Sequence, residues 1–243
     1  MTLNIIGIGL KDENSITLEG LEKIKESEVI YLETYTSQLT NATIEDLEKF
    51  YKKKIIPADR ELVEKKAEET ILKDAKTKMV SFLVIGDPFS ATTHMDLLQR
   101  AKEKDIEVKI INNVSILNAI GIVGLELYKY GKTTSIPFDN ENIKTPLDVY
   151  NKNQSIGLHT LFLLDLRPDE NKFMSCKEAV DFLIKKGLEP ETVIISCAQL
   201  GSNNPSIKTS KAKDVKVINK FPQCLIIPGK LHFVEEEIIE KFN

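Results

Sequence analysis

The chain has 243 residues, of which 42% are hydrophobic and 29% are charged, and its formal net charge is −4 at pH 7. These values are typical of a soluble globular protein that forms one large domain or two small ones. The acidic balance disfavours nucleic-acid binding, since the surface that contacts nucleic acid is basic. The apolar runs are too short to span a membrane, and the amino terminus lacks a signal pattern. We therefore expect a cytoplasmic protein with no nucleic-acid or membrane partner.

The cysteines and histidines do not predict a metal site. Cys176, Cys197 and Cys224 are odd in number and widely spaced, which fits neither a disulfide framework nor a CxxC motif. The three histidines are also scattered along the sequence. We expect buried or partly exposed free thiols and no bound metal.

Strand-like and helix-like segments alternate along the first half of the chain. Short apolar runs predict strands, and apolar residues at helical spacing predict the helices between them. This alternation predicts a mostly parallel sheet with helices on both faces. The expected strands are 3–8, 29–32, 54–57, 80–85 and 108–111. The first three expected helices contain the apolar positions 18, 21 and 24, the positions 44, 47 and 50, and the positions 62, 67 and 71. A further helix is expected at 95–101.

The rest of the chain predicts a second group of elements. Residues 115–130 predict one apolar helix that contains glycines at 121 and 124, and residues 139–144 and 167–172 predict polar surface loops. Further strands are expected at 134–138, 159–166, 192–200 and 223–227, and further helices at 149–154, 176–186 and 234–242. The predicted fold class is therefore α/β, with two α/β lobes on mostly parallel sheets: an amino-terminal domain of residues 1–113 and a carboxyl-terminal domain of residues 114–243.

The segment 86–94 (GDPFSATTH) directly follows a buried-strand pattern. Ligands of open α/β sheets bind at the carboxyl ends of the strands, so this segment is a candidate site. Pro88 keeps Asp87 out of the helical region, and a carboxylate held there could accept hydrogen bonds from a ligand amine or hydroxyl. Alternatively, Asp87 forms an Asx turn that caps the next helix. His94 could orient a substrate or only begin that helix.

Two other strand ends carry candidate residues. The segment 7–10 (GIGL) lacks the third glycine of a dinucleotide fingerprint, because that position is Asp12, so a phosphate cradle is not expected. Two hypotheses remain for this segment: a tight turn that brings the backbone close to an apolar or heterocyclic ligand, and a purely structural turn. Glu33 and Tyr35 end the second strand and could face the same crevice, although packing in the core or rim explains Tyr35 equally well.

Taken in order, these segments resemble the diphthine synthase family. The resemblance extends from about residue 3 to about residue 237 and rests on residues 6–10, 33–37, 86–94, 114–116, 124–131 (GLELYKYG) and 228–232 (PGKLH). The family belongs to the tetrapyrrole-methylase-like methyltransferases, which use S-adenosylmethionine. The resemblance implies their fold, with the cofactor in the cleft between the two lobes.

The resemblance also implies roles for particular residues. It implies cofactor contacts at Leu10, Asp87, Ser90, Ser115 and Ile116, and in the second lobe at Leu164, Leu200 and Gln223, although the family usually has histidine in place of Gln223. The implied acceptor is the amino group of the 3-carboxy-3-aminopropyl-modified histidine of translation elongation factor 2. Three methyl transfers to that group give diphthine, a step of diphthamide biosynthesis. A homodimer is also implied.

The expected chemistry needs little from the protein beyond alignment and exclusion of water, because the methyl donor is already activated. We therefore name no catalytic base. Glu33, Tyr35 and His94 are candidate substrate-facing residues, since a carboxylate or an aromatic face could stabilise the cationic product. Two other hypotheses are a tetrapyrrole or ribosomal RNA methyltransferase of the same superfamily and a binding module without chemistry.

Overall fold

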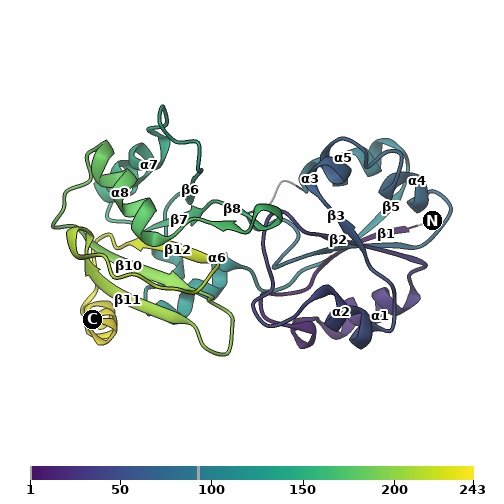
Figure 1. Cartoon of the computed structure of the whole chain (residues 1–243), viewed down its shortest axis with the longest axis horizontal. Coiled ribbons are helices and arrows are strands. Elements are labelled where there is room, and N and C mark those ends of the chain that lie inside the picture. Colours follow the sequence, from purple (N-terminus) through teal and green to yellow (C-terminus); the bar gives the residue numbers. More distant parts are fainter. Residues whose placement is uncertain (1, 92–93) are drawn as a thin grey trace. The chain divides into compact units, whose positions relative to one another are not determined.

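The computed structural model describes residues 2–91 and 94–243, so Thr92 and Thr93 of the 86–94 segment lie outside the described residues. The chain divides into two compact units, Met1–Leu117 and Asn118–Asn243 (Figure 1). The sequence places this boundary between residues 113 and 114. The observed division lies four residues further along, and Ser115 packs in the first unit, where its Cβ is 3.8 Å from the position of a Cβ on Gly86.

The first unit contains a five-stranded sheet in the order β3-β2-β4-β1-β5, and every pairing in it is parallel. The mostly parallel sheet predicted for this part of the chain is therefore confirmed. Its strands begin and end within one or two residues of the predicted runs: β1 (Thr2–Gly7), β2 (Val29–Glu33), β3 (Ile56–Ala58), β4 (Val80–Val84) and β5 (Glu107–Ile111).

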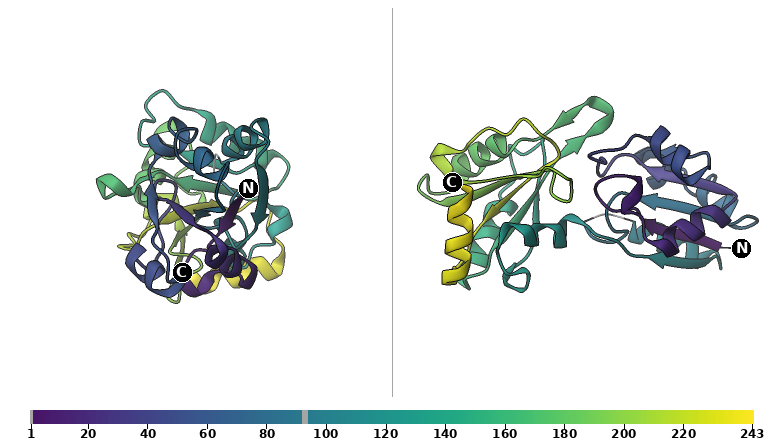
Figure 2. Two further views of the ribbon diagram at one scale, coloured as in Figure 1. Left: turned by 90° about the vertical axis from the view of Figure 1, so that its right-hand side faces the viewer. Right: turned by 90° about the horizontal axis from the view of Figure 1, so that it is seen from below.

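Helices cover both faces of this sheet (Figure 1 and Figure 2). On one face, α1 (Leu18–Glu26) and α2 (Ile44–Tyr51) bury Ile24, Leu47 and Tyr51 in one core. The other face packs against α3 (Arg60–Glu64), α4 (Ile71–Ala75) and α5 (Met95–Glu103) through a second core. Since both faces are covered, the inner strands β1, β2 and β4 are almost wholly buried and mainly apolar, which is why their runs are visible in the sequence.

The second unit contains a five-stranded sheet in the order β11-β10-β12-β7-β6. Only β6 and β7 pair in parallel, so the prediction of a mostly parallel sheet is wrong for this unit. The connection 199–205 between β10 and β11 is too short for the crossover that parallel strands require. The strands are β6 (Thr134–Ile136), β7 (Thr160–Leu164), β10 (Val193–Ala198), β11 (Ser206–Lys211) and β12 (Gln223–Ile227).

The helices of this unit lie close to their predicted positions. Figure 1 shows α7 (Thr145–Ser155) and α8 (Cys176–Lys186) on one face of the sheet, and α9 (Phe233–Ile239) on the other. A small antiparallel hairpin of β8 (Leu166–Arg167) and β9 (Lys172–Phe173) stands where a surface loop was expected.

Residues 115–130 do not form the single helix that their apolar pattern predicts. The segment consists of α6 (Ile116–Ala119) and 3₁₀ turns at Ile120–Val123 and Leu127–Lys129. Gly124 ends the second piece with φ at +88°, where a Cβ would come within 2.1 Å of the Ile238 side chain. This positive φ and the close approach of α9 both require glycine, and together they break the helix.

All three cysteines are buried free thiols, and burial raises the pKa of Cys176 to about 12. Within residues 2–91 and 94–243, no helix is long and apolar enough to cross a membrane. The same residues contain no group of three or more His, Cys, Asp or Glu side chains arranged to hold a metal ion.

A buried carboxylate joins α9 to the segment 124–131. Glu235, only 1% exposed, accepts hydrogen bonds from Glu126 N (3.0 Å) and His232 N (2.8 Å). The Glu235 carboxylate also pairs with Lys129 Nζ and with His159 Nε2, the latter at 3.1 Å. Burial acts to raise the pKa of Glu235, but these hydrogen bonds outweigh burial and lower the pKa to about 2.

His159 connects this carboxylate to the segment 228–232. Its Nδ1 accepts a hydrogen bond from Gly229 N (2.9 Å), so the neutral ring carries its proton on Nε2 and donates it to Glu235. Burial lowers the pKa of His159 against the opposing effect of Glu235. Two segments of the family resemblance, 124–131 and 228–232, therefore meet in one structural network of the second unit.

Both pKa shifts predict a loss of stability in acid. The pKa values of Glu235 and His159 lie below their ordinary 4.5 and 6.5, so their contribution is complete near neutral pH and decreases as the pH falls below about 6.5. Glu235→Gln leaves Lys129 without its buried counter-charge and should lower the free energy of unfolding by roughly 3 kcal/mol at pH 7. Urea unfolding from about pH 7 to about pH 3 should show a shallower acid dependence in this variant than in the wild type.

Glu237→Gln is the matched control, because Glu237 lies on the exposed face of the same helix. Its free energy of unfolding should stay within about 0.5 kcal/mol of the wild type. Equal losses in the two variants would contradict the role assigned to Glu235.

Candidate active site at the carboxyl edge of the first sheet

The carboxyl ends of the five parallel strands meet at one edge of the first sheet, called here the carboxyl edge. From adjacent strands, the chain leaves β1 toward β2 and leaves β4 toward β5, in opposite directions across the sheet. Crevices for ligands form outside strand ends where connections diverge in this way. The segments at this edge are 8–10, 34–36, 59–60, 86–90 and 112–115.

Asp87 lies at the centre of the carboxyl edge and is 7% exposed. Its Oδ1 accepts hydrogen bonds from Phe89 N (3.0 Å) and Ser90 Oγ (2.9 Å). Its Oδ2 accepts from Asn112 Nδ2 (2.9 Å) and Asn113 N (3.2 Å). The first bond closes an Asx turn after β4, and the last two join that turn to the end of β5.

These four hydrogen bonds determine the chemistry of the Asp87 carboxylate. Burial acts to raise its pKa, but the hydrogen bonds from Asn112, Phe89, Asn113 and Ser90 together outweigh burial and lower it. An ionised carboxylate has about four acceptor positions, and all are used here. Direct contact with a ligand amine or hydroxyl would require one of these bonds to open. The structure thus favours Asp87 as the group that shapes the turn.

Asn113 extends the connection from β5 to β1. Its Nδ2 donates to Gly7 O (2.9 Å) and Ser15 O (3.0 Å), and its Oδ1 accepts from Val114 N (2.7 Å). Neither Asn112 nor Asn113 is among the residues predicted from the sequence. Two adjacent asparagines directly after a strand are a turn signal, but their partners 25 and 106 residues away are not visible in the sequence.

Gly9, just after β1, and Gly86, just after β4, bring the backbones of these two strand ends into contact. Gly9 N donates to Gly86 O (3.2 Å) and Gly86 N donates to Gly9 O (2.8 Å), with φ at +73° and +89°. A Cβ on Gly7 would lie 2.6 Å from Gly86 O, so side chains are excluded between the two strand ends. Both hypotheses from the sequence, a turn that approaches a ligand and a purely structural turn, require this tight turn.

Leu10 and Ser115 lie beside Gly86, and Ile116 directly follows Ser115. A Cβ on Gly86 would stand 3.5 Å from Leu10 Cδ2 and 3.8 Å from Ser115 Cβ, which is ordinary contact distance. Ser115 is 4% exposed, and its Oγ accepts from Leu117 N (3.2 Å) at the start of α6, whose first residue is Ile116. All five predicted cofactor residues of the first unit therefore gather at the carboxyl edge.

Glu33, Tyr35 and His94 also come together, but as a largely buried cluster with exposed fractions of 0%, 9% and 1%. Glu33 Oε1 accepts from Tyr35 N (3.0 Å) and from Thr36 N, and Oε2 accepts from Thr36 Oγ1 (2.8 Å). His94 Nε2 lies 3.5 Å from Glu33 Oε2, and the His94 ring meets Phe82 and Tyr35 edge-on. This burial makes Glu33 and His94 supports of the edge rather than groups that face an incoming protein.

The predicted residues of the second unit are buried at strand ends. Leu164 ends β7, and Leu200 follows β10 between Gln199 and Gly201, whose φ angles are both positive. Gln223, which begins β12, accepts from Cys176 N (2.7 Å) at the start of α8.

The amide nitrogen of Gln223 is also used within this unit. It donates to Ile218 O (2.7 Å) and Lys220 O (2.9 Å). Both ends of the amide therefore have structural partners, and its side chain is not free to bind a cofactor.

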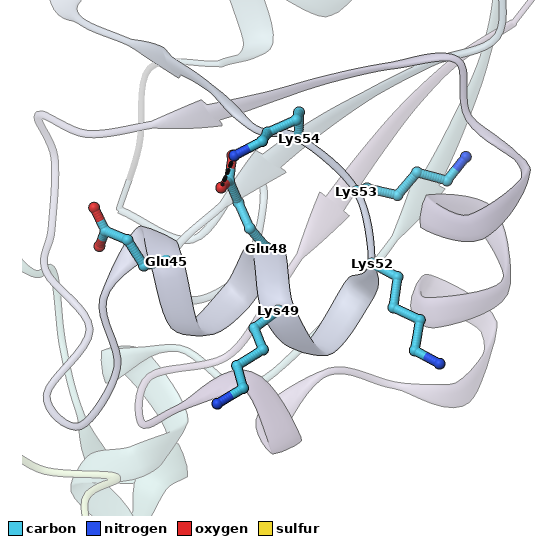
Figure 3. A pocket seen from close by; sticks show the side chains of 6 residues that line it. All are labelled: Glu45, Glu48, Lys49, Lys52, Lys53 and Lys54. Carbon is cyan, nitrogen blue, oxygen red and sulfur yellow. Dashed lines mark hydrogen bonds and ion pairs between the residues drawn. The ribbon is translucent and has the colours of Figure 1, made fainter.

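A groove on α2 is a second surface feature of the first unit. Figure 3 shows Glu48 paired with Lys54, whose Nζ lies 2.8 Å from Glu48 Oε2, and Lys53 Nζ donates to Ser27 O (2.8 Å) just before β2. The groove therefore opens at the amino-terminal edge of the sheet, opposite the carboxyl edge. Lysines at a helix C-terminus are stabilised by the helix dipole and need no ligand. Its lining residues are Glu45, Glu48, Lys49, Lys52, Lys53 and Lys54.

Comparisons with known proteins agree over almost the whole chain. Residues 2–216 match the family of Tetrapyrrole (Corrin/Porphyrin) Methylases. The chain belongs to this family of methyltransferases. It is 44% identical to a diphthine synthase of Methanococcus maripaludis, covering 98% of this chain and 97% of that protein. It is 43% identical to a diphthine methyl ester synthase of Dictyostelium discoideum, covering 100% and 98%.

A solved structure extends the agreement to the fold of this tetrapyrrole methylase. A crystal structure of diphthine synthase matches with a TM-score of 0.92 and 32% identity, covering 100% of this chain and 96% of that one. The resemblance and the fold family inferred from the sequence motifs are confirmed.

The hydrogen bonds of Asp87 predict a large stability effect. Asp87→Ala removes four acceptor contacts and should lower the free energy of unfolding by roughly 2–4 kcal/mol. Ser90→Ala removes one of the four bonds and should cost about 1 kcal/mol. Chemical denaturation of both variants at pH 7 measures the difference. Wild-type stability in Asp87→Ala would contradict the role of this carboxylate in joining the strand ends.

Proposed function

We propose that this protein is a cytoplasmic, S-adenosylmethionine-dependent N-methyltransferase of diphthamide biosynthesis. Its substrate is the amino group of the 3-carboxy-3-aminopropyl-modified histidine of translation elongation factor 2, and three methyl transfers give diphthine. The observation that carries this proposal is the full-length agreement with proteins named diphthine synthase. The two relatives and the solved structure described above are all named for diphthine, and none for the rival acceptors, a tetrapyrrole or ribosomal RNA.

The carboxyl edge fits a nucleoside-type methyl donor. Gly86 has no side chain, so its backbone can approach a flat ring. Leu10 and Ser115 lie at contact distance from the place that a Cβ on Gly86 would occupy, and they would border such a ring. Leu10 supplies apolar contact, and the hydroxyls of Ser90 and Ser115 supply polar contact. Leu164, Leu200 and Gln223 of the second unit stay proposed cofactor contacts on the family resemblance alone.

S-adenosylmethionine, when bound, supplies a methyl group already activated on a sulfonium. The protein's own contribution is to hold both partners in line and to exclude water. Asp87, Asn113 and the paired glycines hold the segments that would do so without rearrangement on binding. An α-amino group has an ordinary pKa near 8, so a useful neutral fraction exists at pH 7 without a strong general base.

A methyl-transfer assay tests the proposal. Protein and S-adenosylmethionine are incubated with elongation factor 2 that carries the aminocarboxypropyl histidine, and with unmodified factor as control. We expect a mass gain of three methyl units on the modified histidine alone. A fourth, base-labile unit would identify a methyl ester, the product named for the Dictyostelium relative. No gain, with cofactor binding intact, would contradict the proposed acceptor.

A homodimer is part of the proposal, and an exposed apolar surface supports it. The segment 126–129 lies against the start of α9, because Glu235 binds both Glu126 N and Lys129. Large apolar side chains of these two segments are exposed by 43–80%, and exposed apolar surface of this kind is typical of protein interfaces. They are Leu127, Tyr128, Phe233 and Val234.

The dimer is tested by sedimentation velocity at micromolar concentration. The wild type should sediment as a dimer, and Tyr128→Glu with Phe233→Glu should sediment as a monomer, since buried charge opposes association. Leu18→Glu is the control, because Leu18 is 81% exposed and lies in the first unit. A monomeric wild type, or a dimeric double variant, would contradict this surface as the interface.

A further inference from the structure

The carboxylates at the carboxyl edge are already engaged. Asp87 accepts four hydrogen bonds, and Glu33 accepts three and lies beside His94. Asp59 caps α3 by accepting a hydrogen bond from Leu62 N (2.7 Å). None of these groups is arranged to receive a further anion, so a carboxylate on a ligand would need a cation at this edge.

Arg60 is a cation at this edge and lies directly after the end of β3. Parallel pairing places Ala58 opposite Glu33, which brings Arg60 beside Tyr35, and the Arg60 Cζ lies 5.3 Å from the centroid of the Tyr35 ring. Tyr35 is itself fixed by the bond from its backbone N–H to Glu33 Oε1 and by edge contact with His94. Arg60 is therefore stacked on a ring that the buried cluster holds in place.

The guanidinium of Arg60 remains open to a ligand. Its side chain is 67% exposed, and its nearest ion-pair contact, from Nε to Glu64 Oε1, is 3.9 Å long, beyond hydrogen-bonding distance. Across the part of the chain that the structure describes, its N–H groups have no hydrogen-bond acceptor. A guanidinium stacked on an aromatic face keeps its edge free for two parallel bonds to a carboxylate.

We propose that Arg60 binds the carboxylate of an α-amino-carboxylate group at the carboxyl edge. This inference rests on the proposed function, in which two groups have that chemistry. They are the aminocarboxypropyl side chain of the protein substrate and the amino-acid tail of S-adenosylmethionine. A bidentate contact would fix the tail so that its amino group, or the sulfonium at its other end, has one orientation. The Arg60–Tyr35 stack thereby acts as a specificity determinant.

Two binding measurements and one kinetic measurement distinguish the two sources. Calorimetry compares S-adenosylhomocysteine with methylthioadenosine, which shares the nucleoside but lacks the amino-carboxylate tail. Methyl transfer to modified elongation factor 2 gives KM and kcat. The variants are Arg60→Gln, which removes the charge, and Arg60→Lys, which keeps the charge but cannot form two parallel hydrogen bonds to a carboxylate. The control is Arg167→Gln, since the Arg167 guanidinium pairs with Asp139 in the second unit. Thermal unfolding verifies that each variant is folded.

If Arg60 holds the cofactor tail, Arg60→Gln should weaken S-adenosylhomocysteine binding roughly tenfold to a hundredfold and leave methylthioadenosine binding unchanged. If Arg60 holds the substrate, KM for the modified factor should rise by a similar factor, with cofactor affinity and kcat retained. Arg60→Lys should be intermediate. A folded Arg60→Gln variant with wild-type constants in every measurement would overturn the proposal.

Failure of the proposed function is separable from failure of this inference. A wild type that neither binds nor methylates modified elongation factor 2 would refute the acceptor. The calorimetric comparison needs no turnover, so it would still decide the role of Arg60. Unchanged cofactor affinity in that case would overturn the inference as well.

Discussion

The arrangement of the candidate active site depends on the carboxylate of Asp87. Its two oxygens join the turn after β4 to the end of β5, and Asn113 extends the same hydrogen-bonded chain to the end of β1. Three of the five strand ends are thereby held by side-chain bonds that need no ligand. A site held in this way is preorganised, which is the main contribution that a methyltransferase must make to a reaction whose donor is already activated.

The second unit uses the same physical device. Glu235 accepts hydrogen bonds from two backbone N–H groups, His159 and Lys129, and so fixes α9 and two loops in one arrangement. The glycines of these loops serve close packing: a Cβ on Gly131 would lie 2.2 Å from Asn153 Oδ1. The two segments of the family resemblance that meet here, 124–131 and 228–232, therefore have a structural role in packing and in the burial of charge.

The sequence predicts the first sheet well because the inner strands β1, β2 and β4 are buried on both faces and are therefore mainly apolar. It does not reveal β11, an edge strand of sequence SIKTSK that lacks an apolar run, and this strand helps to make the second sheet antiparallel. The apolar pattern of residues 115–130 resembles one helix. Only the position of Ile238 against Gly124 shows that the segment must turn there.

The candidate site could be located from the sequence but not understood from it. Gly-Asp-Pro after a buried strand identifies the correct edge, because turn chemistry is local. The saturation of Asp87 depends on Asn112 and Asn113, 25 and 26 residues away, and the stacking of Arg60 on Tyr35 depends on the β2–β3 pairing. Contacts of this kind are tertiary, and a single sequence does not encode them in a visible pattern. The partners of the Gln223 amide, Cys176 N and Ile218 O, are likewise invisible in the sequence, from which the resemblance implies only a cofactor contact at this residue.

The central claim is that the methyl donor binds at the preorganised carboxyl edge of the first sheet. Amide hydrogen exchange with and without S-adenosylhomocysteine tests it most directly. We predict slower exchange on binding in peptides that cover residues 7–10, 86–91 and 112–116, and unchanged exchange around the lysine groove at residues 45–54. Protection confined to the groove, or no protection at these strand ends while calorimetry shows saturable binding, would contradict the account.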